Sequence, residues 1–167
     1  ELGGAEGFRR LSDAARSRGM GLVVDIVPNH VGVERPERNR WWWDVLRHGR
    51  RSPYASYFDI DHNADPAGRI VLPVLGSDTD VERLRVDGDV LRLGDRTFPI
   101  APGTADDGAG GREVHERQHY RLTGWRTGIC GYRRFFSITE LAGVRQEEPA
   151  VFDVCHTEVA RWFSEGL

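Results

Sequence analysis

The sequence predicts an α/β protein interrupted by a long, mostly β-stranded insertion. A helical pattern followed at once by a buried-strand pattern opens the chain, and a second helical pattern closes it. Between the two, strand patterns and a glycine turn replace the helical periodicity. Because a helix joined to a strand is the repeating unit of α/β folds, we expect both ends to belong to one α/β domain.

The first helix is expected at residues 5–18. Apolar side chains recur there at helical spacing, at Phe8, Leu11 and Ala15. Gly19 follows directly, at the position where a left-handed residue commonly ends a helix.

A strand is expected at residues 22–27, an apolar run that carries one carboxylate, Asp25. Pro28 should end it, because proline has no N–H for further pairing. Asn29 and His30 would then stand at the carboxyl end of a buried parallel strand, where α/β folds place their ligands. Asp25 would point inward and need a partner, which we expect to be an arginine. The alternative makes Asp25 a structural ion pair and His30 a loop cap.

The closing helix should begin at Pro149, a favoured first-turn residue, and end at Gly166. Its apolar stripe comprises Val151, Cys155, Val159 and Trp162. A further strand should follow Leu167, so we expect the chain to be an excerpt of a longer one.

The insertion should begin with a short helix, RNRWWWDVLRHG, that Gly49 closes. Strands are expected in RIVLPVLG and ERLRVDGDVLRLGDRTFPI, the second folded at the dipeptide Asp87-Gly88 as a two-residue hairpin. The following APGTADDGAGGRE has no core-forming residues and is predicted to be a mobile loop.

Composition excludes several classes of protein. The 167 residues are 39% hydrophobic and 29% charged, with a formal net charge of −3, so no basic field attracts nucleic acid. No apolar run is long enough to span a bilayer, and the first residues lack the apolar core of a secretory signal. The two cysteines, Cys130 and Cys155, are too few for a disulfide framework. We therefore expect reduced, unreactive thiols in a cytoplasmic protein.

DIVPNH resembles the first conserved region of the α-amylase family, glycoside hydrolase family 13. More of the chain resembles one branch, the maltooligosyltrehalose synthases, in that branch's order. The similar segments are GFRRLSDAARSRGMGLVVDIVPNHVGV, NRWWWDVLRHGRRSPYASYFDID, IVLPVLGSD, FPIAPGT, RQHYRL and YRRFFSITELAGVRQEEPAVFD. The tryptophan triplet with SPYASYFDID, together with YRRFF, makes the resemblance specific. His62 and Gly131 depart from it, since the branch often has Trp and Asn at those positions.

The resemblance implies part of a (β/α)8 TIM barrel with a domain inserted after the third strand. Residues 1–30 would then supply a barrel helix and strand, residues 31–139 the inserted domain, and residues 140–167 the return segment and a second barrel helix.

The implied reaction is an intramolecular transfer of glucose. The reducing-end α-1,4 link of a maltooligosaccharide becomes an α,α-1,1 link, as in trehalose biosynthesis, by a retaining mechanism with an Asp nucleophile and a Glu acid/base. Neither residue is expected in this chain, because the G-x-R-x-D-H motif that carries the nucleophile is absent. Both should lie downstream of Leu167. The resemblance implies no cofactor, no metal, and a functional link to a trehalose-releasing hydrolase.

Carried over by position, His30 resembles the histidine that hydrogen-bonds the transferred glucose, Asn29 shapes its loop, and Asp25 is the structural acid beneath the sugar. Aromatic rings and arginines suit a hydroxyl-rich ligand, so six further residues are candidate substrate contacts. They are Trp42, Tyr132, Arg133, Arg134, Phe135 and Phe136. The alternative for each is packing or ion pairing within the fold.

Three rival functions stay open at this point. Another α-amylase-family hydrolase or transglucosylase is the nearest. HERQH, residues 115–119, fits the H-E-x-x-H pattern of zinc proteases, in which both histidines face one metal. Six arginines around three tryptophans also resemble a single-stranded nucleic-acid surface, although they suit a solvated helix face as well.

Overall fold

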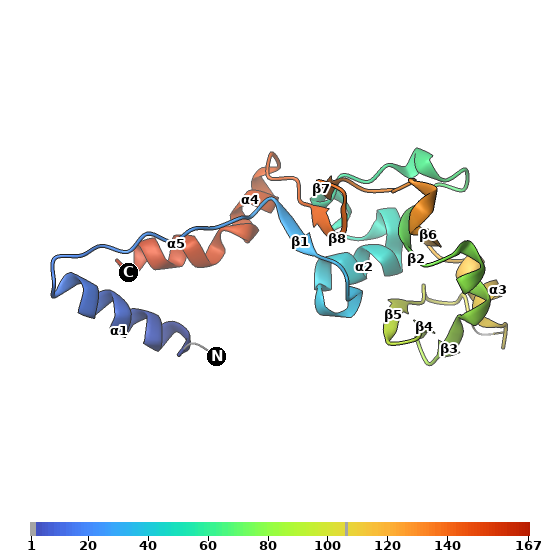
Figure 1. The fold of residues 1–167 in the computed structure, drawn as a ribbon, viewed down its shortest axis with the longest axis horizontal. Coiled ribbons are helices and arrows are strands. Elements are labelled where there is room, and N and C mark those ends of the chain that lie inside the picture. Colours follow the sequence, from blue (N-terminus) through green and yellow to red (C-terminus); the bar gives the residue numbers. More distant parts are fainter. Residues whose placement is uncertain (1–2, 106) are drawn as a thin grey trace. The chain divides into compact units, whose positions relative to one another are not determined.

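The structure, a computed structural model, describes residues 3–105 and 107–167. The chain forms two compact units (Figure 1). The smaller unit contains the described residues up to Pro28 together with Glu147–Leu167, and the larger contains Asn29–Gln146. Helices and strands both contribute, as predicted.

The smaller unit contains three helices: α1 (Gly4–Arg16), α4 (Pro149–Cys155) and α5 (Thr157–Ser164). The rings of Phe8 and Trp162 lie 5.1 Å apart, and Arg9 is 2.9 Å from Glu165. Gly19 has a φ of 71° as predicted, and the chain bends back there, with the amide of Met20 donating to a carbonyl of α1.

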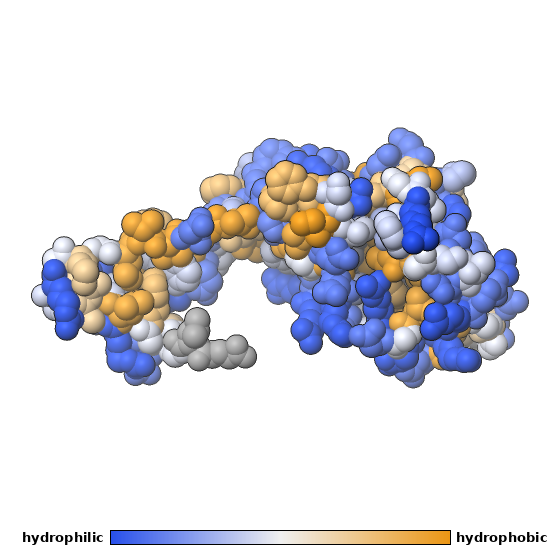
Figure 2. All heavy atoms as spheres, in the orientation of Figure 1, coloured by the Kyte–Doolittle hydropathy of each residue, from blue (hydrophilic) through white to orange (hydrophobic). Residues whose placement is uncertain are grey.

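The predicted strand at residues 22–27 is not a strand in this structure. The segment is extended without pairing, and Val23 is fully exposed. A parallel strand obtains its hydrogen bonds from neighbouring strands. No described strand lies beside this segment, so its apolar side chains are exposed on the smaller unit, whose orange surface Figure 2 shows.

The predicted single helix from Pro149 to Gly166 is also divided. His156 leaves the helical conformation, with φ −104° and ψ 6°, and separates α4 from α5. Val151 is buried, while the other three residues of the apolar stripe are half-buried. Gly166 ends α5 with a φ of 67°, as predicted.

The described residues of the larger unit form two further helices, α2 (Arg40–His48) and α3 (Gly111–Glu116), and three small sheets. Short 3₁₀ helices lie between them: η1 Pro36–Arg38, η2 Gly49–Arg51, η3 Ala55–Tyr57, η4 His62–Ala64, η5 Asp78–Arg83 and η6 Trp125–Thr127. Asn39 caps α2 by accepting from two of its first amides, and Gly49 closes it with a φ of 58°, as predicted.

The first sheet is antiparallel and has the order β1 (His30–Gly32), β8 (Ile138–Gly143), β7 (Arg134–Phe135). The second pairs β2 (Ile70–Leu75) in parallel with β6 (Tyr120–Gly124). Its register shifts between Leu72 and Leu75, where Pro73 has no N–H to donate.

The third sheet is the meander β3 (Arg85–Asp87), β4 (Val90–Leu93), β5 (Arg96–Pro99). The predicted hairpin is present, but its turn lies one residue later than predicted. Asp87 pairs with Val90, so the two turn residues are Gly88 and Asp89. The loop that follows has neither helix nor strand at its described residues, 100–105 and 107–110, and residue 106 lies outside the described residues.

The core of the larger unit forms where α2 and β2 bury their apolar residues. Its largest fully buried side chains include Trp42, Leu46, Ile70, Leu75, Phe98 and Tyr120. Such a core gives the first sheet, which carries the site residues, a rigid support.

Candidate substrate-binding site

The backbone of Asn29 and His30 is fixed by strand pairing. His30 begins β1 and pairs with Gly143, and the carbonyl oxygen of Asn29 accepts from the amide of Val144 at 2.9 Å. Both residues therefore start the first sheet of the larger unit, whereas the sequence predicted a free loop at a strand end.

The side chain of Asn29 determines which ring nitrogen of His30 carries the proton. Nδ1 of His30 lies 2.8 Å from Oδ1 of Asn29. Because an amide oxygen only accepts, Nδ1 carries the proton and donates it. In the neutral ring Nε2 then carries a lone pair that can accept a hydrogen bond from a ligand hydroxyl.

Two phenylalanines adjoin the imidazole. The ring of Phe135 stacks on His30 at 4.3 Å between centroids, and Phe136 meets Phe135 edge-on at 4.5 Å. Phe136 is 82% exposed and has a φ of 54°, which is unusual for a residue with a side chain. The turn between β7 and β8 thus holds an exposed ring in a strained conformation, a combination typical of functional positions.

The two arginines of this turn region are held by their own chain. Arg133 donates to the carbonyl of Val144 at 3.3 Å and lies 3.7 Å from Asp59. Arg134 makes a long contact of 3.4 Å with the carbonyl of Ser137. Arg133 is exposed and Arg134 half-buried, so both can still reach a ligand.

The structure places Trp42 and Tyr132 in the core, which argues against sugar contacts for these two. Trp42 is 1% exposed and meets Phe58 and Tyr132 edge-on. The hydroxyl of Tyr132 donates to the carbonyl of Thr139 at 2.6 Å, and burial raises the pKa of the phenol. Both are large apolar rings whose burial stabilises the fold, which is the alternative stated above.

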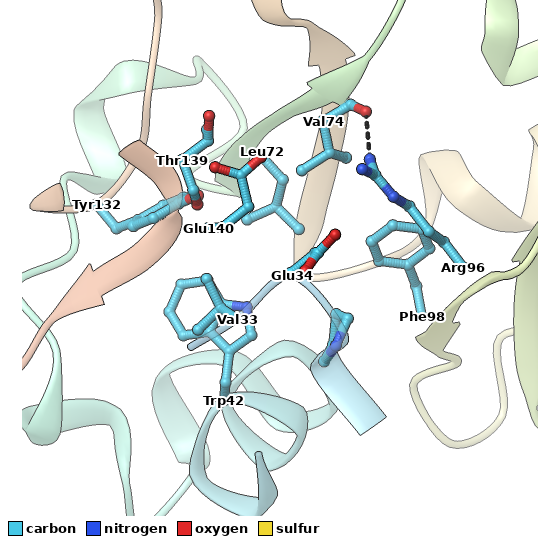
Figure 3. A pocket seen from close by; sticks show the side chains of 11 residues that line it. Val33, Glu34, Trp42, Leu72, Val74, Arg96, Phe98, Tyr132, Thr139 and Glu140 are labelled. Carbon is cyan, nitrogen blue, oxygen red and sulfur yellow. Dashed lines mark hydrogen bonds between the residues drawn. The ribbon is translucent and has the colours of Figure 1, made fainter. Parts of the chain in front are cut away.

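These rings line a cavity together with Glu34, Arg96 and Glu140, and Figure 3 shows the three charged side chains around it. The guanidinium of Arg96 donates to the carbonyl of Val74 at 2.7 Å. The cavity volume is about 20 Å³, room for about one water molecule. It is therefore too small for a glucose ring.

Asp25 does not have the expected buried position. It is exposed in the unpaired segment of the smaller unit, and no ion pair of Asp25 is found among the described residues. An inward position depends on strand pairing that the described part of the chain does not provide.

The H-E-x-x-H residues do not share a helix face. α3 ends at Glu116, before His119. His115 is 1% exposed, and its Nε2 accepts from the amide of Leu122 at 3.0 Å. Burial lowers the pKa of His115 to about 4, which keeps the ring neutral. His115 thus serves as a core acceptor for the backbone of β6.

No sequence pattern predicted the buried ion cluster around Asp65. The carboxylate is fully buried, accepts from Arg69 at 3.0 Å and lies 3.2 Å from Arg121. These bonds, those of Arg69 first, lower the pKa of Asp65 to about 2. A spacing of four residues, as between Asp65 and Arg69, predicts an ion pair only within a helix. This segment is a turn, so helical periodicity could not reveal the pair.

Both cysteines are free thiols and half-buried. Burial raises the pKa of Cys130, whose Sγ lies 3.3 Å from the carbonyl of Tyr132. Such a thiol is a poor nucleophile. Among the described residues, no helix is both long and apolar enough to cross a membrane.

No family model matches the chain. All 167 residues align at 68% identity with 21% of a protein from Mycobacterium tuberculosis (strains CDC 1551 / Oshkosh and H37Rv) that is assigned as a maltooligosyl trehalose synthase. A stretch of 59 residues, 35% of the chain, is 38% identical to 9% of the intracellular maltogenic amylase of Bacillus subtilis.

Solved structures agree with the sequence comparison. The maltooligosyltrehalose synthase of Arthrobacter ramosus superposes with a TM-score of 0.91 at 56% identity, over 97% of this chain and 21% of that one. A hypothetical maltooligosyl trehalose synthase of Sulfolobus tokodaii gives a TM-score of 0.76 at 35% identity, over 95% of this chain and 22% of that one. The chain spans about a fifth of the length of these relatives. The resemblance to the maltooligosyltrehalose synthases is thereby confirmed: the chain corresponds, over its whole length, to a segment of a protein of this family.

Proposed function

We propose that the full-length protein is an intramolecular transglucosylase, an isomerase that turns the reducing-end α-1,4 link of a maltooligosaccharide into an α,α-1,1 link. The observation that carries this proposal is the 68% identity to the M. tuberculosis relative over every residue of the chain. The product would be a maltooligosyltrehalose, which a trehalose-releasing hydrolase could use, and the cytoplasm is the proposed compartment.

Within this proposal, the smaller unit supplies parts of a (β/α)8 barrel and the larger unit is the inserted domain. The exposed apolar segment at residues 22–27 supports this, because it has the composition of an interior strand but no neighbour among the described residues. Asp25 would gain its burial and its arginine only when neighbouring strands flank it.

The contribution of this chain to the reaction is to bind the sugar. Nε2 of His30 accepts from a hydroxyl of the transferred glucose, and Asn29 is a positioning residue that fixes the proton on Nδ1. The exposed ring of Phe136, with Phe135 behind it, offers an apolar face to the sugar ring. Arg133 and Arg134 border this surface. The nucleophile and the acid/base are proposed to lie outside this chain.

The test is incubation of the full-length protein with maltopentaose. Loss of reducing ends without release of glucose is expected, because the leaving sugar is recaptured within the site. The 167-residue chain alone is the control and should form no product, because we place both catalytic carboxylates outside it.

A second candidate is an amylase-type hydrolase, which the 59-residue match to the maltogenic amylase favours. Hydrolysis would raise the number of reducing ends in the same assay. The direction of that single readout therefore separates the two candidates.

A further inference from the structure

A basic pocket of about 350 Å³ lies in the larger unit and shares no lining residue with the surface around His30. Three arginines and three histidines line it: His48, Arg50, Arg51, His62, Arg69 and His119. None of the described residues that line it is Asp or Glu. The pocket thus gathers positive charge in a chain whose formal net charge is −3.

Some of this charge is already neutralised within the fold. Arg69 binds Asp65 and Glu116, and Nε2 of His48 lies 3.8 Å from the carboxylate of Asp44. Arg50 and Arg51 are exposed, and the described part of the chain provides no hydrogen bond or ion pair for either guanidinium. Two unneutralised guanidinium groups are therefore available to a ligand.

The imidazoles of His62 and His119 line the same pocket as these two arginines. Nδ1 of His62 lies 2.9 Å from the carbonyl of Gly68, so Nδ1 carries a proton, and Nε2 can donate to an anion only when the ring is protonated at both nitrogens. The pKa of His119 is lowered, mainly by burial and then by the charges of Arg51 and His48. A bound anion would relieve that repulsion.

The backbone holds these groups in place. A Cβ at Gly49 would lie 2.8 Å from Cγ of the His119 ring, and Gly49 has a φ of 58°. Only glycine allows this approach and this turn together. η2 begins at Gly49 and continues through Arg50 and Arg51, so the close packing of His119 on Gly49 fixes the backbone from which both arginines extend.

We propose that this pocket binds a phosphate dianion, either free or as the monoester of a small metabolite. Guanidinium groups form paired, charge-assisted hydrogen bonds with phosphate oxygens. The volume lies near the lower end of the ~300–1,000 Å³ typical of small-molecule pockets, which accommodates a phosphate with a small organic group. The proposal does not depend on the transglucosylase activity.

The experiment titrates the full-length protein by calorimetry at fixed ionic strength. The probes are glucose 6-phosphate, inorganic phosphate and glucose. The variant Arg50→Ala/Arg51→Ala is compared with Arg38→Ala/Arg40→Ala, whose residues are also exposed, lie outside the pocket and change the charge equally.

Both phosphates should bind the wild type and glucose should not bind this pocket. Affinity should fall by about tenfold or more in the pocket variant, because each lost charge-assisted hydrogen bond removes about that factor, and stay unchanged in the control. Equal affinities for glucose 6-phosphate and inorganic phosphate would show that the phosphate alone is recognised. Tighter binding of glucose 6-phosphate would show that the sugar is bound as well. Either result supports the proposal. Absence of phosphate binding, or an equal loss in both double variants, would overturn it.

Discussion

Replacing His30 tests the proposed site, because the catalytic and structural costs can be estimated separately. A hydrogen bond that Nε2 accepts from a hydroxyl of the transferred glucose, and that strengthens as charge develops on that sugar, is worth roughly 2–4 kcal/mol, or about 10²–10³ in kcat. The structural loss in His30→Ala comprises stacking on Phe135, about 0.5–1.5 kcal/mol, and the bond to Asn29, about 1 kcal/mol.

His30→Phe is the matched control for this structural loss. It keeps an aromatic ring on Phe135 but has no nitrogen to accept a hydroxyl. We expect His30→Phe to lose only the stability of the bond to Asn29, about 1 kcal/mol, while kcat on maltopentaose falls by about 10²–10³. His30→Ala should show the same fall in kcat and lose the stability of the stacking on Phe135 as well. Near-normal kcat in His30→Phe, measured on the full-length protein, would show that His30 only caps the loop, and the sugar-binding role would be wrong.

Three further predictions concern other residues of the larger unit. Phe136→Gly should be more stable than Phe136→Ala by about 1 kcal/mol in thermal unfolding, because glycine accepts the φ of 54° without strain. Both variants should raise KM equally, because both lose the ring. A KM equal to that of the wild type would exclude the ring from the site. Trp42→Phe should lower the melting temperature but leave KM unchanged, since Trp42 is 1% exposed; a raised KM in a fully folded variant would contradict the core assignment. Asp65 has its pKa lowered to about 2, so its ion pairs with Arg69 stabilise the fold above about pH 4 and that stability, roughly 2 kcal/mol, is lost as pH falls toward 2. Melting curves of Asp65→Asn should be shifted down at pH 6 and approach the wild type near pH 2, and an equal shift at both pH values would refute the account.

Helix ends and hairpins were predictable because they depend on neighbouring residues. Gly19, Gly49 and Gly166 each end a helix or its turn with positive φ, as their positions indicated. The hairpin turn was displaced by one residue to Gly88-Asp89, because Asp87 joins the ladder opposite Val90. Local chemistry identifies a turn but not the register of the strands around it.

Features that depend on distant residues were not predictable. The segment at residues 22–27 has the sequence of a buried strand, yet no described strand pairs with it. The buried carboxylate of Asp65 binds Arg121, far away in sequence, and no pattern announces such a contact. His115 fits a zinc motif but accepts a backbone amide, because the short helix α3 ends before the second histidine.

The candidate site was predicted in part. The sequence singled out His30 and Phe135, and the structure brings their rings into stacking contact. It also singled out Trp42 and Tyr132, which the structure places in the core. Aromatic side chains suit both a sugar surface and an interior, so composition alone does not separate the two uses.

The most direct measurement of the central proposal is a proton NMR spectrum of the product that the full-length protein forms from maltopentaose. We expect the signals of the reducing-end anomers to disappear and an α,α-1,1-linked anomeric signal to replace them, while the product keeps all five glucose units of the maltopentaose. Free glucose or shorter chains with intact reducing ends would instead demonstrate hydrolysis and contradict the transglucosylase assignment.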